Sequence, residues 1–180
     1  MTQLGMIRDG IKGTGRLIKV DHAGEFGAIN IYRAQILVAR VTAPGIVPTL
    51  RDFLSHERKH LKIFQDVLSK RGIPRCRSYW FCGIGGYILG LVTALLGRSG
   101  IMACTAAVET VVTGHLVDQI ERLRNEGDVE ALEAVQAIVA EELEHREVGV
   151  SEGRTSVLYK PVSSVVSAAT SFVIWLGMTL

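Results

Sequence analysis

Apolar residues recur along most of this chain three, four and seven positions apart, which is the spacing of an amphipathic helix. Few stretches alternate apolar and polar residues, so strands are not expected. Pro44 and Pro48 follow the first helical segment, Gly72 and Pro74 the second, and Gly127 the fourth. The predicted fold class is all-α, with a helical bundle as the default architecture. The helices are expected over residues 17–40, 48–70, 78–97, 100–126, 128–149 and 156–180.

Two stretches of 20 residues carry no formal charge, 78–97 and 161–180. A helix of about 20 residues is long enough to cross a hydrocarbon core of roughly 30 Å. Glycines interrupt the first stretch, however, and serines and threonines dilute the second. We therefore expect a monotopic protein, whose apolar helices enter one leaflet without spanning the bilayer.

The composition narrows the possible classes of protein. With 180 residues the chain has the size of one domain, and 48% hydrophobic residues with a mean hydropathy of +0.27 exclude intrinsic disorder. The 20 Lys and Arg nearly balance the 18 Asp and Glu and form no basic cluster, so nucleic-acid binding is not expected. We expect a tail over 1–15 without a secretory signal, then one domain over 16–180. Three cysteines without zinc-site spacing are interpreted as packing thiols in a reducing compartment: Cys76, Cys82 and Cys104.

Glutamate and histidine positions repeat between the two halves of the chain. Glu25 precedes a Glu57-x-x-His60 pair by 32 residues, and Glu109 precedes a second Glu-x-x-His pair, at residues 142–145, by 33 residues. Residues three apart share one face of a helix, so each pair is able to bind one ion. The near-equal spacing predicts two pseudo-symmetric halves, with Glu25 facing Glu109 and His60 facing His145.

These residues have the composition of a dinuclear carboxylate site. Four carboxylates balance the charge of two divalent cations, and neutral imidazoles complete the coordination. A single Glu-x-x-His is more often a solvated helix face. Glu109 argues against that interpretation, because its apolar neighbours Ala107 and Val111 make an unpaired buried carboxylate costly.

Several other residues have two interpretations each. His22 either supports Glu25 or makes hydrogen bonds at the start of the helix, and His115 lies at the surface or behind the ligands. Asp21 and Glu141 are candidates to orient the ring N–H of a metal-bound histidine. The glycines on either side of Glu25, Gly24 and Gly27, admit either an isoprenoid substrate or a neighbouring helix.

Three stretches are specific enough to be compared with known families: residues 20–28 (Val-Asp-His-Ala-Gly-Glu-Phe-Gly-Ala), Glu57-x-x-His60-Leu61, and Glu141-Glu142-Leu143-Glu144-His145. From Arg16 onward the chain closely resembles the demethoxyubiquinone hydroxylases of ubiquinone biosynthesis. The resemblance implies a ferritin-like four-helix bundle with extra apolar membrane-contacting helices. It also implies that Glu57 and Glu142 bridge two irons. The implied ligands are Glu25, Glu57, His60, Glu109, Glu142 and His145.

The implied activity is a membrane-associated di-iron monooxygenase that hydroxylates the ring of demethoxyubiquinol. It requires two iron ions, dioxygen and a two-electron reductant, for which we expect NADH, with Arg16 or Lys19 meeting its phosphates. The expected partners are an isoprenoid quinol, a lipid-binding accessory protein and the membrane surface. That surface is the cytoplasmic face of a bacterial inner membrane or the matrix face of the mitochondrial one. Gly114-His115-Leu116 stands where many relatives carry His-His-Tyr, so no tyrosine role is expected there.

Two alternatives remain at this stage. A ferritin-like iron-handling or peroxide-scavenging protein shares the same ligand set but works in water, and does not need long uncharged stretches. A non-catalytic membrane-associated helical protein would make the repeated Glu-x-x-His spacing a coincidence.

Overall fold

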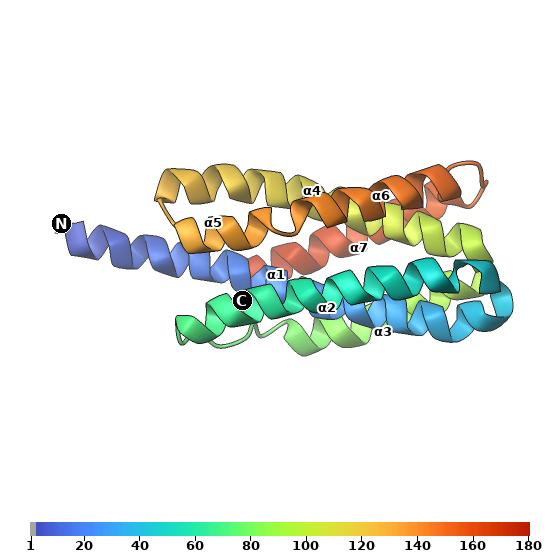
Figure 1. Ribbon diagram of the computed structural model, residues 1–180, viewed down its shortest axis with the longest axis horizontal. Helices are drawn as coiled ribbons and strands as arrows, with labels where there is room; N and C mark the ends of the chain where they lie inside the picture. The colour runs from blue at the N-terminus through green and yellow to red at the C-terminus, as the bar shows by residue number, and fades with distance from the viewer. Residues whose placement is uncertain (1–2) are drawn as a thin grey trace.

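The computed structural model describes residues 3–180, with side chains from residue 13 onward, and this range is helical without any strand. The all-α prediction is confirmed. Seven α-helices and one short 3₁₀ helix run along a common long axis (Figure 1). They are α1 (Gln3–Thr42), η1 (Pro44–Ile46), α2 (Val47–Lys70), α3 (Tyr79–Leu95), α4 (Gly97–Glu126), α5 (Val129–Gln136), α6 (Val139–Gly153) and α7 (Tyr159–Thr179).

Helices α1, α2, α4 and α6 form the four-helix bundle, in which α1 packs on α2 and α4 packs on α6. The other two long helices are additions to it, since α3 packs along α1 and α7 packs along α4. Two large apolar cores fill the bundle, and two smaller apolar clusters join it to α3 and α7. One large core surrounds Tyr32, Phe53 and Met102, and the other surrounds Phe64 and Leu123. On each bundle helix, the Glu and His positions of the repeat fall between these two cores, so apolar packing supports the polar layer on both sides.

The glycines of the uncharged stretch 78–97 allow α3 to approach α1 closely. A Cβ atom on Gly86 would overlap the carbonyl oxygen of Gly27, and one on Gly90 would overlap that of Ile31. Gly27 likewise faces the backbone of Cys82, with 3.3 Å between a built Cβ and the carbonyl oxygen. Gly27 therefore serves helix packing, which was one of the two interpretations of this residue.

Two predicted helix boundaries are wrong. The first helix begins at Gln3 instead of residue 17, so most of the expected tail is helical; residues 1 and 2 lie outside the described range. The added turns pack on the rest of the chain, because Thr14 is buried and a Cβ on Gly15 would meet Ile73 at 2.7 Å. The helix expected over 128–149 is interrupted at residues 137–138, which separates α5 from α6. Neither residue is Gly or Pro, and the apolar spacing continues through the break with Ile138 fully buried, so the sequence carried no signal for it.

Three other predicted ends differ by three or four residues, since α4 begins at Gly97, α6 ends at Gly153 and α7 begins at Tyr159. The predicted ends of α2 and α4 are confirmed. Gly72 and Gly127 follow α2 and α4 with φ of 61° and 70°, the left-handed conformation that glycine adopts most readily. Asp128 caps α5, because its side chain accepts a hydrogen bond of 3.1 Å from the backbone N–H of Ala131.

Candidate metal centre

The bundle brings all six repeat residues to one place in its interior. Each comes from the helix face that points to the bundle axis, and none is more than 5% exposed. Helix α1 contributes one glutamate, α4 another, and α2 and α6 contribute one Glu-x-x-His pair each. The residues are Glu25, Glu57, His60, Glu109, Glu142 and His145.

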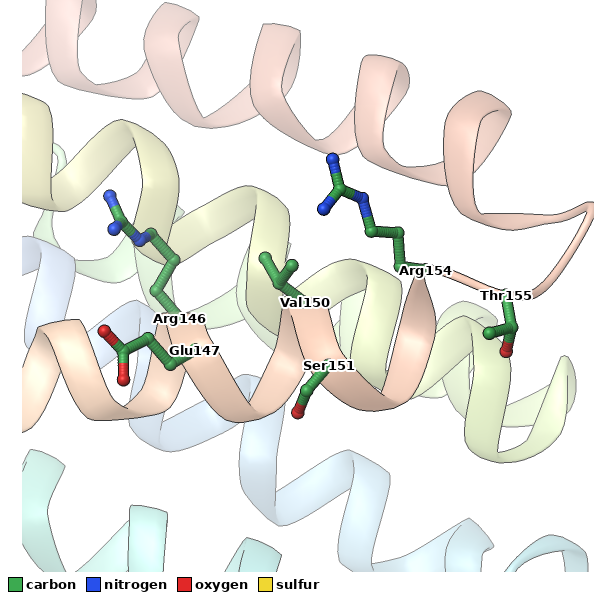
Figure 2. Close-up of a pocket in the computed structure, with 6 residues that line it drawn as sticks. All are labelled: Arg146, Glu147, Val150, Ser151, Arg154 and Thr155. Carbon is green, nitrogen blue, oxygen red and sulfur yellow. The ribbon is translucent and has the colours of Figure 1, made fainter.

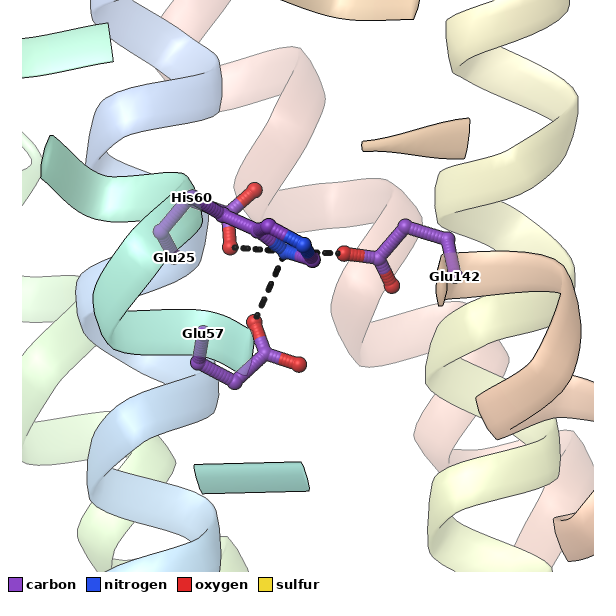
Figure 3. A group of neighbouring side chains, drawn as sticks. All are labelled: Glu25, Glu57, His60 and Glu142. Atoms are coloured by element: carbon purple, nitrogen blue, oxygen red, sulfur yellow. Dashed lines mark ion pairs between the residues drawn. The ribbon is translucent and has the colours of Figure 1, made fainter. Parts of the chain in front are cut away.

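His60 lies at the centre of the first group, and Figure 3 shows three carboxylates converging on its ring. Its Nδ1 atom is 2.8 Å from Glu142 Oε1, 3.6 Å from Glu25 Oε2 and 3.9 Å from Glu57 Oε2. One ligand atom from each of the four residues lies within 4.8 Å of the others. Two ligand atoms that each lie about 2.0–2.4 Å from a common ion are at most about 4.8 Å from each other. The group therefore has the dimensions of a single-ion site.

The second group contains His145 and Glu109 and again includes Glu57 and Glu142. The Nδ1 atom of His145 is 3.2 Å from Glu57 Oε1 and 3.8 Å from Glu142 Oε2. Glu57 and Glu142 thus present one oxygen to His60 and the other oxygen to His145. The two imidazole rings face each other as the repeat predicted, with 6.4 Å between their centroids.

The donor set fits cations in preference to an internal hydrogen-bond network. Three buried ligand atoms make no hydrogen bond within the described part of the chain: Glu57 Oε1, His60 Nδ1 and His145 Nδ1. The 2.8 Å contact of His60 with Glu142 therefore lacks the N–H···O geometry of a hydrogen bond. Because buried polar atoms are nearly always satisfied, these three unsatisfied atoms, which belong to the two ligand groups, indicate that cations belong in both groups.

Electrostatics leads to the same conclusion. Burial raises the pKa of Glu25, Glu57 and Glu109 well above the usual glutamate value, and the charge of Glu142 raises each further. Burial also lowers the pKa of His145 to about 4, so its imidazole is neutral, which is the form that binds a metal. Without cations the site therefore holds carboxyl groups that resist ionisation. Two divalent ions would remove this penalty.

Residues around the six candidates hold them in position. Glu141 Oε2 accepts a hydrogen bond of 2.7 Å from His60 Nε2, as the sequence suggested, and Lys59 pairs with the other oxygen at 2.6 Å. The hydroxyl of Tyr32 donates to Glu109 Oε1 at 3.1 Å, and His56 Nδ1 lies 3.0 Å from His145 Nε2. The sequence analysis missed both. Tyr32 stands seven residues after Glu25, which places it on the same helix face, whereas the partner of His56 is 89 residues away.

The remaining candidates lie away from the two histidines. Asp21 accepts a hydrogen bond of 2.8 Å from Gln119. Within the described residues it forms no ion pair with His60 or His145. His22 stacks on Tyr79 at 5.1 Å. The guanidinium of Arg16 donates to the carbonyl oxygen of Met178, at the end of α7. Neither Arg16 nor Lys19 is among the described residues that line the cavity next to the site.

That cavity has a volume of about 330 Å³ and reaches four of the six residues, Glu25, Glu57, Glu109 and Glu142. Its wall is mainly apolar, from α1, α3, α4 and α7. Gly24 and Gly27 both line it, and Gly24 has open space where a Cβ would be, so the other interpretation considered for the pair also applies. His115 also lines it, with a buried Nε2 that makes no hydrogen bond in the described structure.

A separate depression lies over the outer side of α6 (Figure 2). Its lining residues come from α6 and the turn that follows it, and it shares no residue with the cavity. We therefore place the candidate site in the cavity. The depression is lined by Arg146, Glu147, Val150, Ser151, Arg154 and Thr155.

Comparison with known families agrees with this geometry. Residues 12–177 match the family described as ubiquinone biosynthesis protein COQ7. The chain belongs to the COQ7 family. The two expectations of family and fold are thereby confirmed.

Curated relatives of this COQ7-family chain cover most of its length. A Dictyostelium discoideum protein named NADPH-dependent 3-demethoxyubiquinone 3-hydroxylase is 40% identical over 167 residues, 90% of this chain and 75% of the relative. The Homo sapiens protein of the same name is 34% identical over 182 residues, 98% of this chain and 83% of the relative. A Rhodospirillum rubrum 3-demethoxyubiquinol 3-hydroxylase is 33% identical over 163 residues, 90% of this chain and 76% of the relative.

Proposed function

We propose that the chain is a di-iron monooxygenase that hydroxylates the ring of a demethoxyubiquinol in ubiquinone biosynthesis. One observation carries the proposal: two carboxylates, Glu57 and Glu142, each belong to both four-residue groups, at the inner end of an apolar cavity. A dinuclear site requires carboxylates shared by two ions, and an apolar cavity suits a lipid substrate. The names of the relatives support the same reaction.

The proposed roles follow from the positions of the side chains. Glu57 and Glu142 would bind both ions. Glu25 and His60 would complete the coordination of one ion, and Glu109 and His145 that of the second ion. These six residues would hold two ferrous ions, which would supply the redox chemistry that activates dioxygen, with one oxygen atom entering the ring and the other leaving as water. Tyr32 holds Glu109 and Glu141 holds His60, which limits reorientation of these ligands during turnover. The apolar cavity wall orients the ring and excludes bulk water.

Each turnover needs two electrons and two protons in addition to dioxygen. The names of the Dictyostelium and human relatives include the words NADPH-dependent, which supports a reduced nicotinamide nucleotide as the donor class. Between NADH and NADPH we propose NADH, and the choice is tested by comparing the rates with the two nucleotides. Arg16 and Lys19 stay candidates for its phosphates, although Arg16 would first have to leave its hydrogen bond to Met178.

Two helices of the described chain, α4 and α7, are long and apolar enough to cross a membrane by length and composition alone. Helix α4 is a bundle helix, and 67% of its apolar 18-residue stretch is buried. In α7 only 11% of the corresponding stretch is buried. Phe81 of α3 and Phe172 of α7 are each 53% exposed and also line the cavity, so its mouth opens on the apolar surface formed by these two helices. We propose that this surface enters one leaflet and that the quinol reaches the site through the mouth.

An iron-handling or peroxide-scavenging protein is the second candidate, because it would use the same six residues. The apolar cavity favours the hydroxylase, since neither ferrous ion nor hydrogen peroxide gains from an apolar path. Deleting the encoding gene distinguishes the two functions. The hydroxylase predicts accumulation of the demethoxy quinone precursor, whereas an iron or peroxide function predicts an unchanged quinone profile.

The reaction is tested on the purified protein and on one ligand variant. We expect about two irons per chain in the wild type. The Glu142→Ala variant should keep the helical fold, because two apolar cores flank the site, but lose iron and hydroxylation, as should Glu57→Ala. Full turnover by a Glu142→Ala protein would contradict the proposal, and so would a wild-type protein that binds no iron.

A further inference from the structure

The two candidate metal histidines are supported by different partners. Each presents Nδ1 to the carboxylates of the site and Nε2 to a residue outside it. For His60 that residue is the carboxylate of Glu141, at 2.7 Å. For His145 it is the imidazole of His56, whose Nδ1 lies 3.0 Å from His145 Nε2 and whose ring lies edge to edge with that of His145, with 5.2 Å between centroids and 5° between planes.

Proton positions follow from these contacts once Nδ1 binds a cation. A metal-bound Nδ1 carries no proton, so the proton of each neutral ring resides on Nε2 and is donated outward. His60 donates to a carboxylate, which makes a charge-assisted hydrogen bond about twice as strong as a neutral one. His145 donates to His56 Nδ1, which must therefore be unprotonated, with the proton of His56 on its Nε2.

From this difference we infer that His56 is a positioning residue that makes the two metal positions unequal. The inference rests on the proposed function and adds a property that the near-symmetric repeat would not suggest. A charged acceptor makes the donating imidazole a stronger ligand than a neutral acceptor does. The ion beside His60 is therefore bound more tightly than the ion beside His145. Partial burial and the nearly common plane of the two rings, which suits an in-plane N–H···N hydrogen bond, hold His56 in the acceptor orientation.

Two substitutions at position 56 separate hydrogen bonding from packing. His56→Leu removes the acceptor, whereas His56→Asn puts a carbonyl oxygen close to the former position of Nδ1 and restores it. Glu141→Gln is the reciprocal variant for the other histidine. Thermal unfolding of each metal-free protein shows whether the variant folds like the wild type.

The first measurement is titration of the metal-free proteins with Co²⁺. The wild type should bind two ions in distinguishable steps. We expect His56→Leu to weaken the second step by roughly 10–100-fold with little change in the first, and His56→Asn to recover most of that loss. Glu141→Gln should instead weaken the first, tighter step.

The second measurement is Mössbauer spectroscopy of the proteins loaded anaerobically with ⁵⁷Fe²⁺. Two quadrupole doublets of equal area are expected, with His56→Leu shifting one doublet and Glu141→Gln shifting the other. If the wild type binds two ions but His56→Leu changes neither the doublets nor the second step, the inference is wrong and the proposed function stands. If the wild type binds fewer than two ions, the proposed function fails and the inference fails with it.

Discussion

The buried glutamates oppose the stability of the fold that contains them. Glu109 is 2% exposed, and burial together with the charges of Glu142 and Glu57 raises its pKa. A carboxyl group whose pKa is higher in the folded state binds a proton that the unfolded chain has released. Folding therefore becomes less favourable as the pH rises above the usual glutamate pKa of 4.5. The contribution of these buried glutamates to the stability of the metal-free protein should accordingly be more favourable at pH 5 than at pH 7.5.

Glu109→Gln should stabilise the metal-free protein. Glutamine keeps an oxygen that accepts the hydrogen bond from Tyr32 but never ionises, so the free energy of unfolding at pH 7.5 should rise by roughly 1–3 kcal/mol. The gain should shrink as the pH approaches 4.5, where the unfolded glutamate also takes up its proton. Urea unfolding with EDTA at several pH values measures this difference. With saturating Fe²⁺ the wild type should instead be the more stable of the two proteins, because the variant has lost one carboxylate ligand of the metal. A metal-free variant that is less stable than the wild type at pH 7.5 would contradict the explanation.

At the scale of helices, the approach of α3 to α1 depends on glycine. Gly86→Ala places a Cβ against the backbone oxygen of Gly27, which has no rotamer to yield, so the free energy of unfolding should fall by about 1–3 kcal/mol. Gly114→Ala is the matched control. It lies inside α4 with nothing within 4 Å of its built Cβ, so alanine should stabilise by roughly 0.5–1 kcal/mol. Urea unfolding of both variants tests the assignment, and equal effects at the two positions would refute close packing.

An ion-pair cluster joins the end of α2 to the start of α5. The two terminal nitrogens of Arg71 each bond an oxygen of Asp128 at 2.7 Å, and Nε bonds Glu130 at 2.9 Å. Burial alone would raise the pKa of Asp128, but the hydrogen bonds from Arg71, Thr14 and the backbone of Ala131 outweigh it and lower the pKa to about 2. The cluster therefore stabilises the fold at neutral pH and loses its effect in acid.

Arg71→Met should reduce the free energy of unfolding at pH 7 by roughly 1.5–3 kcal/mol. Because the pKa of Asp128 is depressed in the folded state, this contribution is complete above the usual value of 3.8 and disappears as the pH falls towards about 2. The pH dependence of urea unfolding, compared between wild type and variant, measures it. Lys62→Met is the control, because it breaks an exposed pair with Asp66 and should cost no more than about 0.5 kcal/mol. A penalty for Arg71→Met that persists unchanged at pH 2 would exclude the ion pair as its cause.

At the scale of the whole molecule, α3 and α7 present the apolar surface that we propose enters the membrane. Both tryptophans of the chain lie on it, Trp80 at 65% and Trp175 at 59% exposure. Their fluorescence should therefore shift to the blue when the protein binds vesicles of phosphatidylcholine and phosphatidylglycerol in a 3:1 ratio. Recovery of the protein entirely in the soluble fraction would contradict membrane association, and protease cleavage from both sides of a sealed vesicle would contradict entry into a single leaflet.

Two substitutions on the exposed side of α3 test the docking surface. Ile84→Glu and Ile88→Glu, made together, should lower the vesicle partition coefficient at least about tenfold, because two exposed isoleucines no longer enter the lipid. Val129→Glu is the control. Val129 is 63% exposed, comparable to Ile84 at 64%, but lies at the start of α5, outside the apolar surface. Equal losses of binding for the double variant and the control would argue against docking through α3.

The sequence by itself determined the helical class, most helix ends and the six residues of the candidate site. These features depend on spacing within a few turns of one helix: Glu57 and His60 share a face wherever α2 is placed, and Gly127 ends α4 through its own backbone conformation. The tertiary structure alone decided which oxygens of Glu57 and Glu142 face which histidine, the break between α5 and α6, and the contact of His56 with His145. Such contacts join residues tens of positions apart. They depend on how four helices pack around two apolar cores, which no local periodicity specifies.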